Sequence, residues 1–196
     1  IRTSEALYQA CRFPHRPDIQ RLIIGELSPM TAKMKSKPHR SDSRRDWDHV
    51  RVKIMRWCLR VKLAQNWEKF STLLLATDDR PIVEESRKDD FWGAKSTNHE
   101  VLTGMNVLGR LLMELREELR TGKAEQLCRV EPPNISEFLL LGNPVGTVST
   151  RGAPPSELGL PLRVAASQHP APSNGVVHNQ AGFASTDTTE GNFGMK

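Results

Sequence analysis

The sequence predicts a mostly helical α+β domain with a small sheet, followed by a largely disordered tail. Apolar residues recur at helical spacing through much of residues 1–121, where strand character is confined to 81–85. Residues 131–196 differ, because they hold eight of the thirteen prolines and eight of the thirteen glycines but only eight charged residues. Few apolar residues there are spaced for burial, so this stretch cannot easily offset the entropy lost on ordering.

Three short helices are expected in the first forty residues, approximately. The first opens the chain and includes residues 5–12, and the second starts at Pro17. A third follows, with Ser28 as its N-cap and Pro29 at its first position, and ends near Lys37, after which residues 37–45 are expected to form a loop. The second helix is expected to bury three apolar residues, namely Ile19, Leu22 and Ile23.

The strongest pattern spans residues 47–64, where apolar positions advance by three or four and basic residues fall largely elsewhere. This helix is expected to form the spine of the core. Asn66 can cap the next helix, and a strand over 81–85 and a helix over 108–120 follow, the last ended by Gly122. The helix after Asn66 is expected to direct Trp67, Phe70, Leu73 and Leu74 inward.

Charge is concentrated in the part of the chain expected to fold. Residues 1–130 contain 25 Lys and Arg against 18 Asp and Glu, whereas the remainder carries a net charge of −2. A basic surface favours phosphate-bearing partners, either a phosphorylated small molecule or a nucleic acid, although many basic proteins bind neither. The three cysteines fit neither a disulfide framework nor a zinc site, and a cytoplasmic location without membrane partners is the default expectation.

The first expected helix has a polar face where a core-facing helix should be apolar. Glu5, Tyr8, Gln9 and Arg12 recur at i, i+3, i+4 and i+7, so they share one side, while the opposite side can pack inward. Four hydrogen-bonding or charged groups are thus directed together toward something other than an ordinary core. This cluster indicates a site.

These residues, with Phe13, form a Glu-x-x-Tyr-Gln-x-x-Arg-Phe pattern that resembles the opening motif of the NADAR family, the YbiA-like N-glycosidases that act on ribosylated bases. Four further segments agree in order along the chain. They are the SPM-x-AK segment from Ser28 to Lys33, the tryptophan motif Asp46-Trp47-Asp48, the D-x-x-WG turn from Asp89 to Gly93, and a closing helix that begins with Gly104-x-Asn106. Arg12 stands where the family usually has Lys.

The resemblance implies an N-glycosidase domain over residues 1–121 and a tail of low order over 122–196. Members of the family begin with strands that close one wall of the pocket, so the chain is expected to be an N-terminally truncated fragment. The implied substrates carry ribose 5-phosphate or ADP-ribose on a nitrogen base, as in early riboflavin-pathway intermediates or ADP-ribosylated guanine in nucleic acid. No metal or redox cofactor is implied.

Cleavage of an N-glycosidic bond passes through an oxocarbenium-like sugar, so a site needs carboxylates that stabilise positive charge or activate water. The motifs place Glu5 and Asp89 in these roles, with Asp90 as a substitute for Asp89. Glu5 lies near a helix N-terminus, where the helix dipole favours its ionised form. Without the resemblance, Glu5 is more simply a surface residue that matches the dipole, and Asp89 part of a solvated charged turn.

Substrate binding falls to the remaining motif residues. Trp47 and Trp92 are expected to hold the base between them, whereas Trp57 and Trp67 are expected in the core. Arg12, Lys33 and Asn106 are expected to bind the sugar phosphate, and Tyr8 and Gln9 share the polar face. For any single tryptophan or basic residue, the alternatives are core packing and surface solubility, and solubility is favoured for Arg44 and Arg45.

Two further functions remain open at the level of the sequence. A catalytically silent module that binds ADP-ribose or nucleic acid would explain the basic surface equally well. A purely structural helical domain would bind neither ligand. A nucleotide-hydrolysing P-loop is not supported, because Arg110-Leu111 follows the glycine-containing segment where Lys-Ser/Thr is required.

Overall fold

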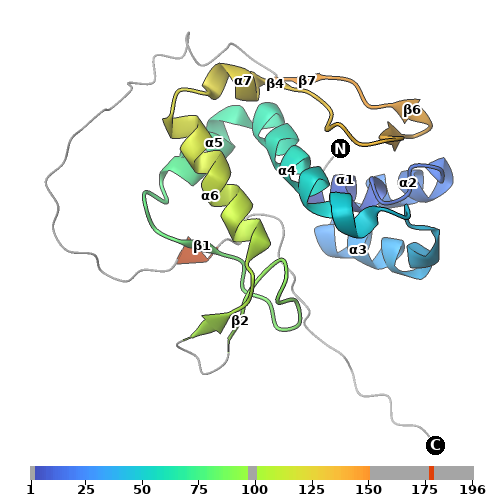
Figure 1. Ribbon diagram of the computed structural model, residues 1–196, viewed down its shortest axis with the longest axis horizontal. Coiled ribbons are helices and arrows are strands. Elements are labelled where there is room, and N and C mark those ends of the chain that lie inside the picture. The colour runs from blue at the N-terminus through green and yellow to red at the C-terminus, as the bar shows by residue number, and fades with distance from the viewer. Residues whose placement is uncertain (1–2, 97–100, 151–176, 179–196) are drawn as a thin grey trace, which may run out of the picture.

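The computed structural model describes residues 3–96, 101–150 and 177–178 (Figure 1). Its helices are α1 (Ser4–Ala10), α2 (Pro17–Ile24), α3 (Pro29–Ser36), the 3-10 helix η1 (Lys37–Asp42), α4 (Trp47–Gln65), α5 (Trp67–Leu75), α6 (Val107–Arg120) and α7 (Ala124–Cys128). Its strands are β1 (Ile82–Val83), β2 (Lys95–Ser96), β3 (Leu102–Thr103), β4 (Arg129–Val130), β5 (Leu139–Leu140), β6 (Asn143–Pro144), β7 (Val148–Ser149) and β8 (Val177–His178). The mostly helical α+β prediction is confirmed.

Helix α4 is the spine of the domain, as its apolar periodicity predicts. It runs through the middle of the molecule, with α1, α2 and α3 on one side and α6 on the other (Figure 1). Both Trp57 and Trp67 are buried in the main core, together with the inward stripe of α6. A second, smaller cluster joins α1, α2 and α3 around Phe13, Ile23 and Ala32.

The sheets are small two-stranded units. Three are antiparallel, β2 with β3, β4 with β7, and β5 with β6, while β1 pairs in parallel with β8. An isolated bridge joins Glu85 to Ala94 and holds the two ends of the intervening loop together. Strand β1 therefore leads directly into a closed loop, residues 84–94, which carries much of the site described below.

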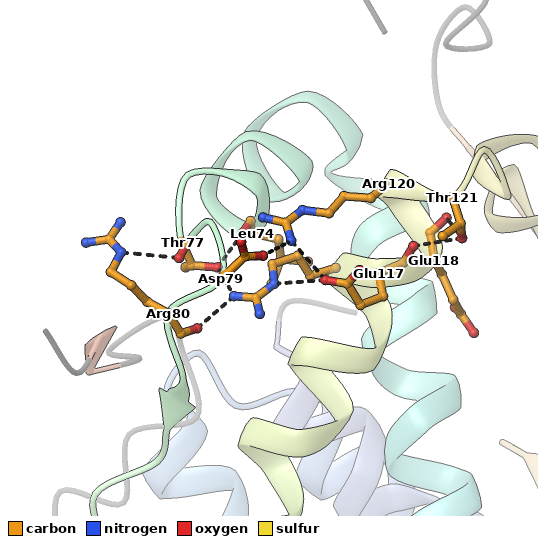
Figure 2. A network of polar contacts seen from close by, with 9 residues as sticks. Leu74, Thr77, Asp79, Arg80, Glu117, Glu118, Arg120 and Thr121 are labelled. Carbon is orange, nitrogen blue, oxygen red and sulfur yellow. Dashed lines mark hydrogen bonds and ion pairs between the residues drawn. The ribbon is translucent and has the colours of Figure 1, made fainter. Parts of the chain in front are cut away.

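The loop that enters β1 is tied to α6 by a polar network (Figure 2). The guanidinium group of Arg116 is buried and donates to Thr77 Oγ1 at 2.7 Å and to the Arg80 carbonyl oxygen at 2.8 Å. Arg120 donates to Asp79 at 2.6 Å and to Glu117 at 3.0 Å (Figure 2). A buried arginine that satisfies a backbone carbonyl fixes the path of the chain into β1.

Three local expectations differ from the structure. Leu22 and Leu73 are 42% and 51% exposed, because each lies at the edge of its helix's apolar stripe and no element among the described residues covers it. The expected loop after Lys37 is largely the 3-10 helix η1. Arg44, expected at the surface, is buried and donates to Asp46 at 2.6 Å and to the Ser136 carbonyl oxygen at 2.8 Å.

Ordered chain extends beyond the boundary expected at residue 121. Residues 122–150 form α7, β4, β5, β6 and β7, and Phe138 is buried against Trp57 with ring centroids 5.0 Å apart. Backbone groups in this segment form hydrogen bonds through the pairing of β5 with β6 and with the Gln20 side chain. Gln20 Nε2 donates to the Leu139 carbonyl oxygen, and Gln20 Oε1 accepts from the Leu141 N–H. The rest of the expected tail, apart from β8, lies outside the described residues.

Within the described part of the chain, no helix combines the length and the apolar character needed to span a bilayer. The longest helix, α4, carries charged residues along its outer side.

Candidate active site

A cavity of about 210 Å³ lies where α1, α3 and α4 meet the loop after β1. Helix α1 and the residues after it supply one wall, and the 84–94 loop supplies the facing one. The lining residues are Glu5, Tyr8, Gln9, Arg12, Lys33, Arg40, Arg51, Met55, Glu84, Ser86, Asp89, Phe91, Trp92, Gly93 and Leu108. The polar face of the first helix therefore opens on a cavity and not on bulk solvent.

Seven of the nine site residues expected from the sequence line this cavity. They come from segments far apart in the chain, namely Glu5, Tyr8, Gln9, Arg12, Lys33, Asp89 and Trp92. The two that do not are Trp47 and Asn106. The charges of Lys33, Arg12 and Asp89 all act on the Glu5 carboxyl, which places the two candidate acids in one electrostatic environment.

Glu5 is buried and bonded, not a surface residue at a helix end. Its Oε1 accepts a hydrogen bond from Gln9 Nε2 at 2.8 Å. Burial raises the pKa of Glu5 above its usual 4.5, while the Gln9 hydrogen bond and the Lys33 and Arg12 cations act in the opposite direction. The expectation that the helix dipole would set the ionised form is corrected here, because desolvation outweighs these favourable interactions.

Asp89 is held by a turn that its own side chain forms. Its Oδ1 accepts from the backbone N–H groups of Phe91 at 3.0 Å and Trp92 at 2.8 Å, and Ser86 Oγ accepts from the Asp89 N–H at 3.0 Å. The carboxylate is thereby fixed at the cavity wall. Asp90 does not line the cavity and is paired with Lys95 at the surface, at 2.9 Å, so it is not a substitute for Asp89.

The two motif tryptophans do not form a sandwich. Trp92 lines the cavity, but Trp47 is buried in the main core and contacts the ring of Tyr8, at a centroid distance of 5.0 Å. Tyr8 also meets Trp92 edge-on at 5.5 Å. Tyr8 therefore lies between the two indoles, so Trp47 supports Tyr8 from within the core while Trp92 lines the cavity.

Asn106 has a structural role in place of the expected ligand contact. Its Oδ1 accepts from the Glu84 N–H at 3.0 Å and its Nδ2 donates to the Ile82 carbonyl oxygen at 2.9 Å. The residue adopts a left-handed conformation, φ 48°, at the start of α6, which asparagine tolerates better than most residues. Asn106 thus joins α6 to β1 with the amide that was expected to bind substrate.

Three arginines gather at one part of the cavity. Burial lowers the pKa of Arg12, and the Arg40 and Arg51 cations add to this effect. The Arg12 guanidinium lies 4.4 Å from the Trp47 ring centroid, and that of Arg51 lies 3.8 Å from the centroid of Phe91. Arg12 Nε is buried and has no hydrogen-bond acceptor among the described residues. Such a cluster suits a phosphate group.

Sequence patterns alone missed Arg40, Arg51, Glu84, Ser86 and Phe91. Arg51 follows Trp47 by one helical turn and Glu84 lies near the end of the predicted strand over 81–85, so helix periodicity and strand position were the signals that could have found them. Glu84 and Ser86 are both buried. Among the described residues, no group of three or more His, Cys, Asp or Glu side chains is arranged to hold a metal ion.

Comparison with known proteins places this arrangement in a family. The NADAR domain profile matches residues 1–120. The N-glycosidase YbiA of Escherichia coli is 37% identical over 124 residues, which cover 62% of this chain and 72% of that protein. An N-glycosidase of Nostoc punctiforme is 36% identical over 120 residues, which cover 60% and 74%.

Two further matches concern length and fold. A riboflavin biosynthesis protein of Vibrio vulnificus is 36% identical over 118 residues, but the match covers only 30% of its length. The NMR structure of Escherichia coli YbiA superposes with a TM-score of 0.52 at 35% identity and covers 62% of this chain and 69% of that one. With a family match over more than half of its residues, the chain belongs to the NADAR domain family.

Proposed function

We propose that this chain hydrolyses the N-glycosidic bond between a nitrogen base and the ribose of a ribose 5-phosphate or ADP-ribose group. The observation that carries the proposal is the polarity of the cavity. Two carboxylates, Glu5 and Asp89, lie with Trp92 on its lining, and Arg12, Arg40 and Arg51 form a cationic cluster on the same cavity. The relatives named N-glycosidase support the reaction class.

The chemistry assigned to each group follows from its surroundings. As the bond from C1′ to the base nitrogen breaks, positive charge develops on the sugar and is stabilised by Asp89, whose carboxylate is fixed by backbone donors. A water oxygen bonds to C1′ and gives its proton to Glu5. That proton is then available to the departing base nitrogen, so free base and ribosyl phosphate are the products.

Burial makes Glu5 suited to the proton step. A carboxylate with a raised pKa is a stronger base once ionised, and its proton affinity is closer to that required near neutral pH. Arg12, Arg40 and Arg51 supply guanidinium groups for the phosphate, and Trp92 presents its ring to the base.

Glu5→Gln in the full chain tests the proposal. Release of free base from a pyrimidine ribosyl 5-phosphate and from an oligonucleotide carrying ADP-ribosylated guanine should fall by about 10²- to 10⁴-fold, the usual contribution of acid–base catalysis. Glu68→Gln, at an exposed carboxylate in the first turn of α5, should retain the wild-type rate. An unchanged rate in Glu5→Gln would remove the proposed role.

Glu5→Gln must also be shown to fold. The raised pKa of Glu5 predicts how the stability of the variant relative to wild type changes with pH. Because the folded pKa of Glu5 is raised, the folded state binds more protons, and its stability falls as pH rises from 4.5 through the folded value. Glu5→Gln removes the buried charge. Its melting temperature relative to wild type should therefore be higher at pH 7 than at pH 4.

The competing function is a binding module that recognises ADP-ribose or nucleic acid without turnover. The Arg12–Arg40–Arg51 cluster would serve it as well. Calorimetry with ADP-ribose would then show binding while no free base appears from either substrate. Affinity for unmodified DNA that falls steeply with salt would identify nucleic acid as the ligand, since each phosphate contact releases counterions.

A further inference from the structure

A chain of buried hydrogen bonds connects α3 to the Glu5 carboxyl. Ser36 Oγ donates to Gln9 Oε1 at 2.9 Å, and Gln9 Nε2 donates to Glu5 Oε1 at 2.8 Å. Ser36 is 1% exposed and lies at the last position of α3, away from the cavity lining. Its hydroxyl is also 2.8 Å from the carbonyl oxygen of Lys33.

The direction of this chain depends on the protonation of Glu5. A glutamine amide has a donor end and an acceptor end, and only the donor end can face an ionised carboxylate, whereas the acceptor end can pair with the O–H of a protonated carboxyl. Toward the ionised form Gln9 must present Nε2, and its Oε1 then needs a donor, which Ser36 provides. Toward the protonated form Gln9 can instead present Oε1, which accepts from the new Glu5 O–H.

Ser36 can satisfy both arrangements because a hydroxyl both donates and accepts. When the Gln9 amide turns over, its Nε2 can donate to Ser36 Oγ, and the Ser36 hydroxyl can donate to the Lys33 carbonyl oxygen within reach. Each buried group keeps a partner in both states. A buried group without a partner would instead penalise one of the two states.

We propose that Ser36 is a positioning residue for Glu5, whose hydroxyl lets the Gln9 amide follow the uptake and release of the Glu5 proton. The proton transfer itself rests on the proposed function, whereas the hydrogen-bond chain does not. Ser36→Ala leaves Gln9 Oε1 without its donor when Glu5 is ionised. With Glu5 protonated and the amide turned, Gln9 Oε1 instead accepts from the Glu5 O–H, so the variant favours protonated Glu5.

The other charged and titratable groups near Glu5 stay in place in this variant. They are Tyr8 and Arg12 from the first helical segment, Lys33 from α3, Cys58 from α4, and Glu84 and Asp89 from the loop after β1. A change in Glu5 titration therefore reports the loss of the hydroxyl. Ser71→Ala is the matched control, since Ser71 is buried and bonds a carbonyl three residues earlier in α5.

The first readout does not need turnover. The full chain labelled with ¹³C at glutamate Cδ would be titrated by NMR, with Glu5→Gln identifying the Glu5 signal. In Ser36→Ala the midpoint should move to higher pH, and in Ser71→Ala it should coincide with wild type. Ser36→Ala should add nothing in a Gln9→Leu background, because the effect passes through Gln9. An unmoved midpoint in Ser36→Ala overturns the proposal.

The second readout is the pH profile of base release. For Ser36→Ala the acid limb of kcat/KM should move to higher pH, with about a tenfold loss on that limb, while the plateau stays within about twofold. A loss of packing alone would lower the plateau and leave the limb in place, and that result contradicts the proposal. If the NMR midpoint moves but wild type releases no base, the positioning role stands and the glycosidase function fails.

Discussion

Arg51 shows how a residue outside any recognisable motif joins a site through its neighbours. Its guanidinium is stacked 3.8 Å from the centroid of Phe91, and it pairs with Asp48 at 3.6 Å on its own helix. Stacking holds the guanidinium plane without using its in-plane N–H groups. Arg12 is held in the same manner by Trp47, so ring contacts orient both guanidinium groups without a bound anion.

Arg51→Ala should therefore raise KM for a phosphorylated substrate and lower kcat/KM by about tenfold or more, since a hydrogen bond to a charged group contributes about 1.5–3 kcal/mol. The change in kcat should be smaller, because the phosphate is remote from the reacting bond. Arg56→Ala is the control on the same helix, where Arg56 pairs with Glu114 at 2.8 Å. Equal losses in the two variants would argue against phosphate binding at Arg51.

Motifs and helix spacing in the sequence predicted most of the residues that line the cavity, but not where one side chain had two possible partners. Glu5, Lys33 and Asp89 were found because each occupies a fixed place in a motif. Asn106 was assigned to substrate because an amide suits a ribose as well as it suits a backbone. Only the approach of β1 to α6 decides between these uses, and no local pattern encodes that approach.

At the level of elements, the junction between β1 and α6 positions the acidic wall of the cavity. Asn106 bonds both Ile82 and Glu84, and a Cβ at residue 109 would overlap the carbonyl oxygen of Ile82. The strand can lie this close to the helix only because residue 109 is glycine. Glu84 and the loop after it depend on this contact for their position.

Gly109→Ala should lower the free energy of unfolding by about 2–3 kcal/mol, the cost of overpacking a well-packed contact. Substrate turnover should fall as well, since β1 must move and carries the cavity wall with it. Gly146→Ala should change stability by less than about 0.5 kcal/mol, because a Cβ there meets no atom of the described part of the chain within 4 Å. Chemical denaturation of both variants measures the difference, and equal stabilities would show that the junction tolerates a methyl group.

Helices were easier to predict than their exposed edges. Periodicity located α4 and α6 to within a residue or two, since their apolar stripes are long. The same periodicity placed Leu22 and Leu73 inside, although each lies at the margin of its stripe. Whether a marginal position is covered depends on the neighbouring element, which sequence spacing does not specify.

Across the whole molecule, the segment of residues 136–145, here termed the clasp, joins two parts of the fold. Phe138 packs on Trp57 of α4, and Gln20 of α2 bonds to Leu139 at 3.1 Å and to Leu141 at 2.6 Å. Composition hid this segment, because proline and glycine are common around it. The contacts of the clasp come from one aromatic ring, Phe138, and from the buried Gln20 amide, so they produce no periodic apolar pattern in the sequence.

Phe138→Ala should lower the free energy of unfolding by about 3 kcal/mol or more, as expected for removing a buried phenyl ring. Leu141→Ala, in the same clasp but at a 37% exposed side chain, should cost less than about 1 kcal/mol. Thermal melts of the two variants provide the comparison. Similar melting temperatures for the two variants would mean that burial of Phe138 contributes little to stability.

The clasp also bears on how the gene should be trimmed. The stretch matched to the family ends at residue 120, yet Gln20, Arg44 and Trp57 each find a partner between 136 and 141. A polypeptide that ended at residue 120 would expose the Trp57 ring and would remove the hydrogen-bond partners of the Gln20 amide and the Arg44 guanidinium in this segment. Expression plasmids for crystallisation should therefore extend past the family boundary and include residues 136–141.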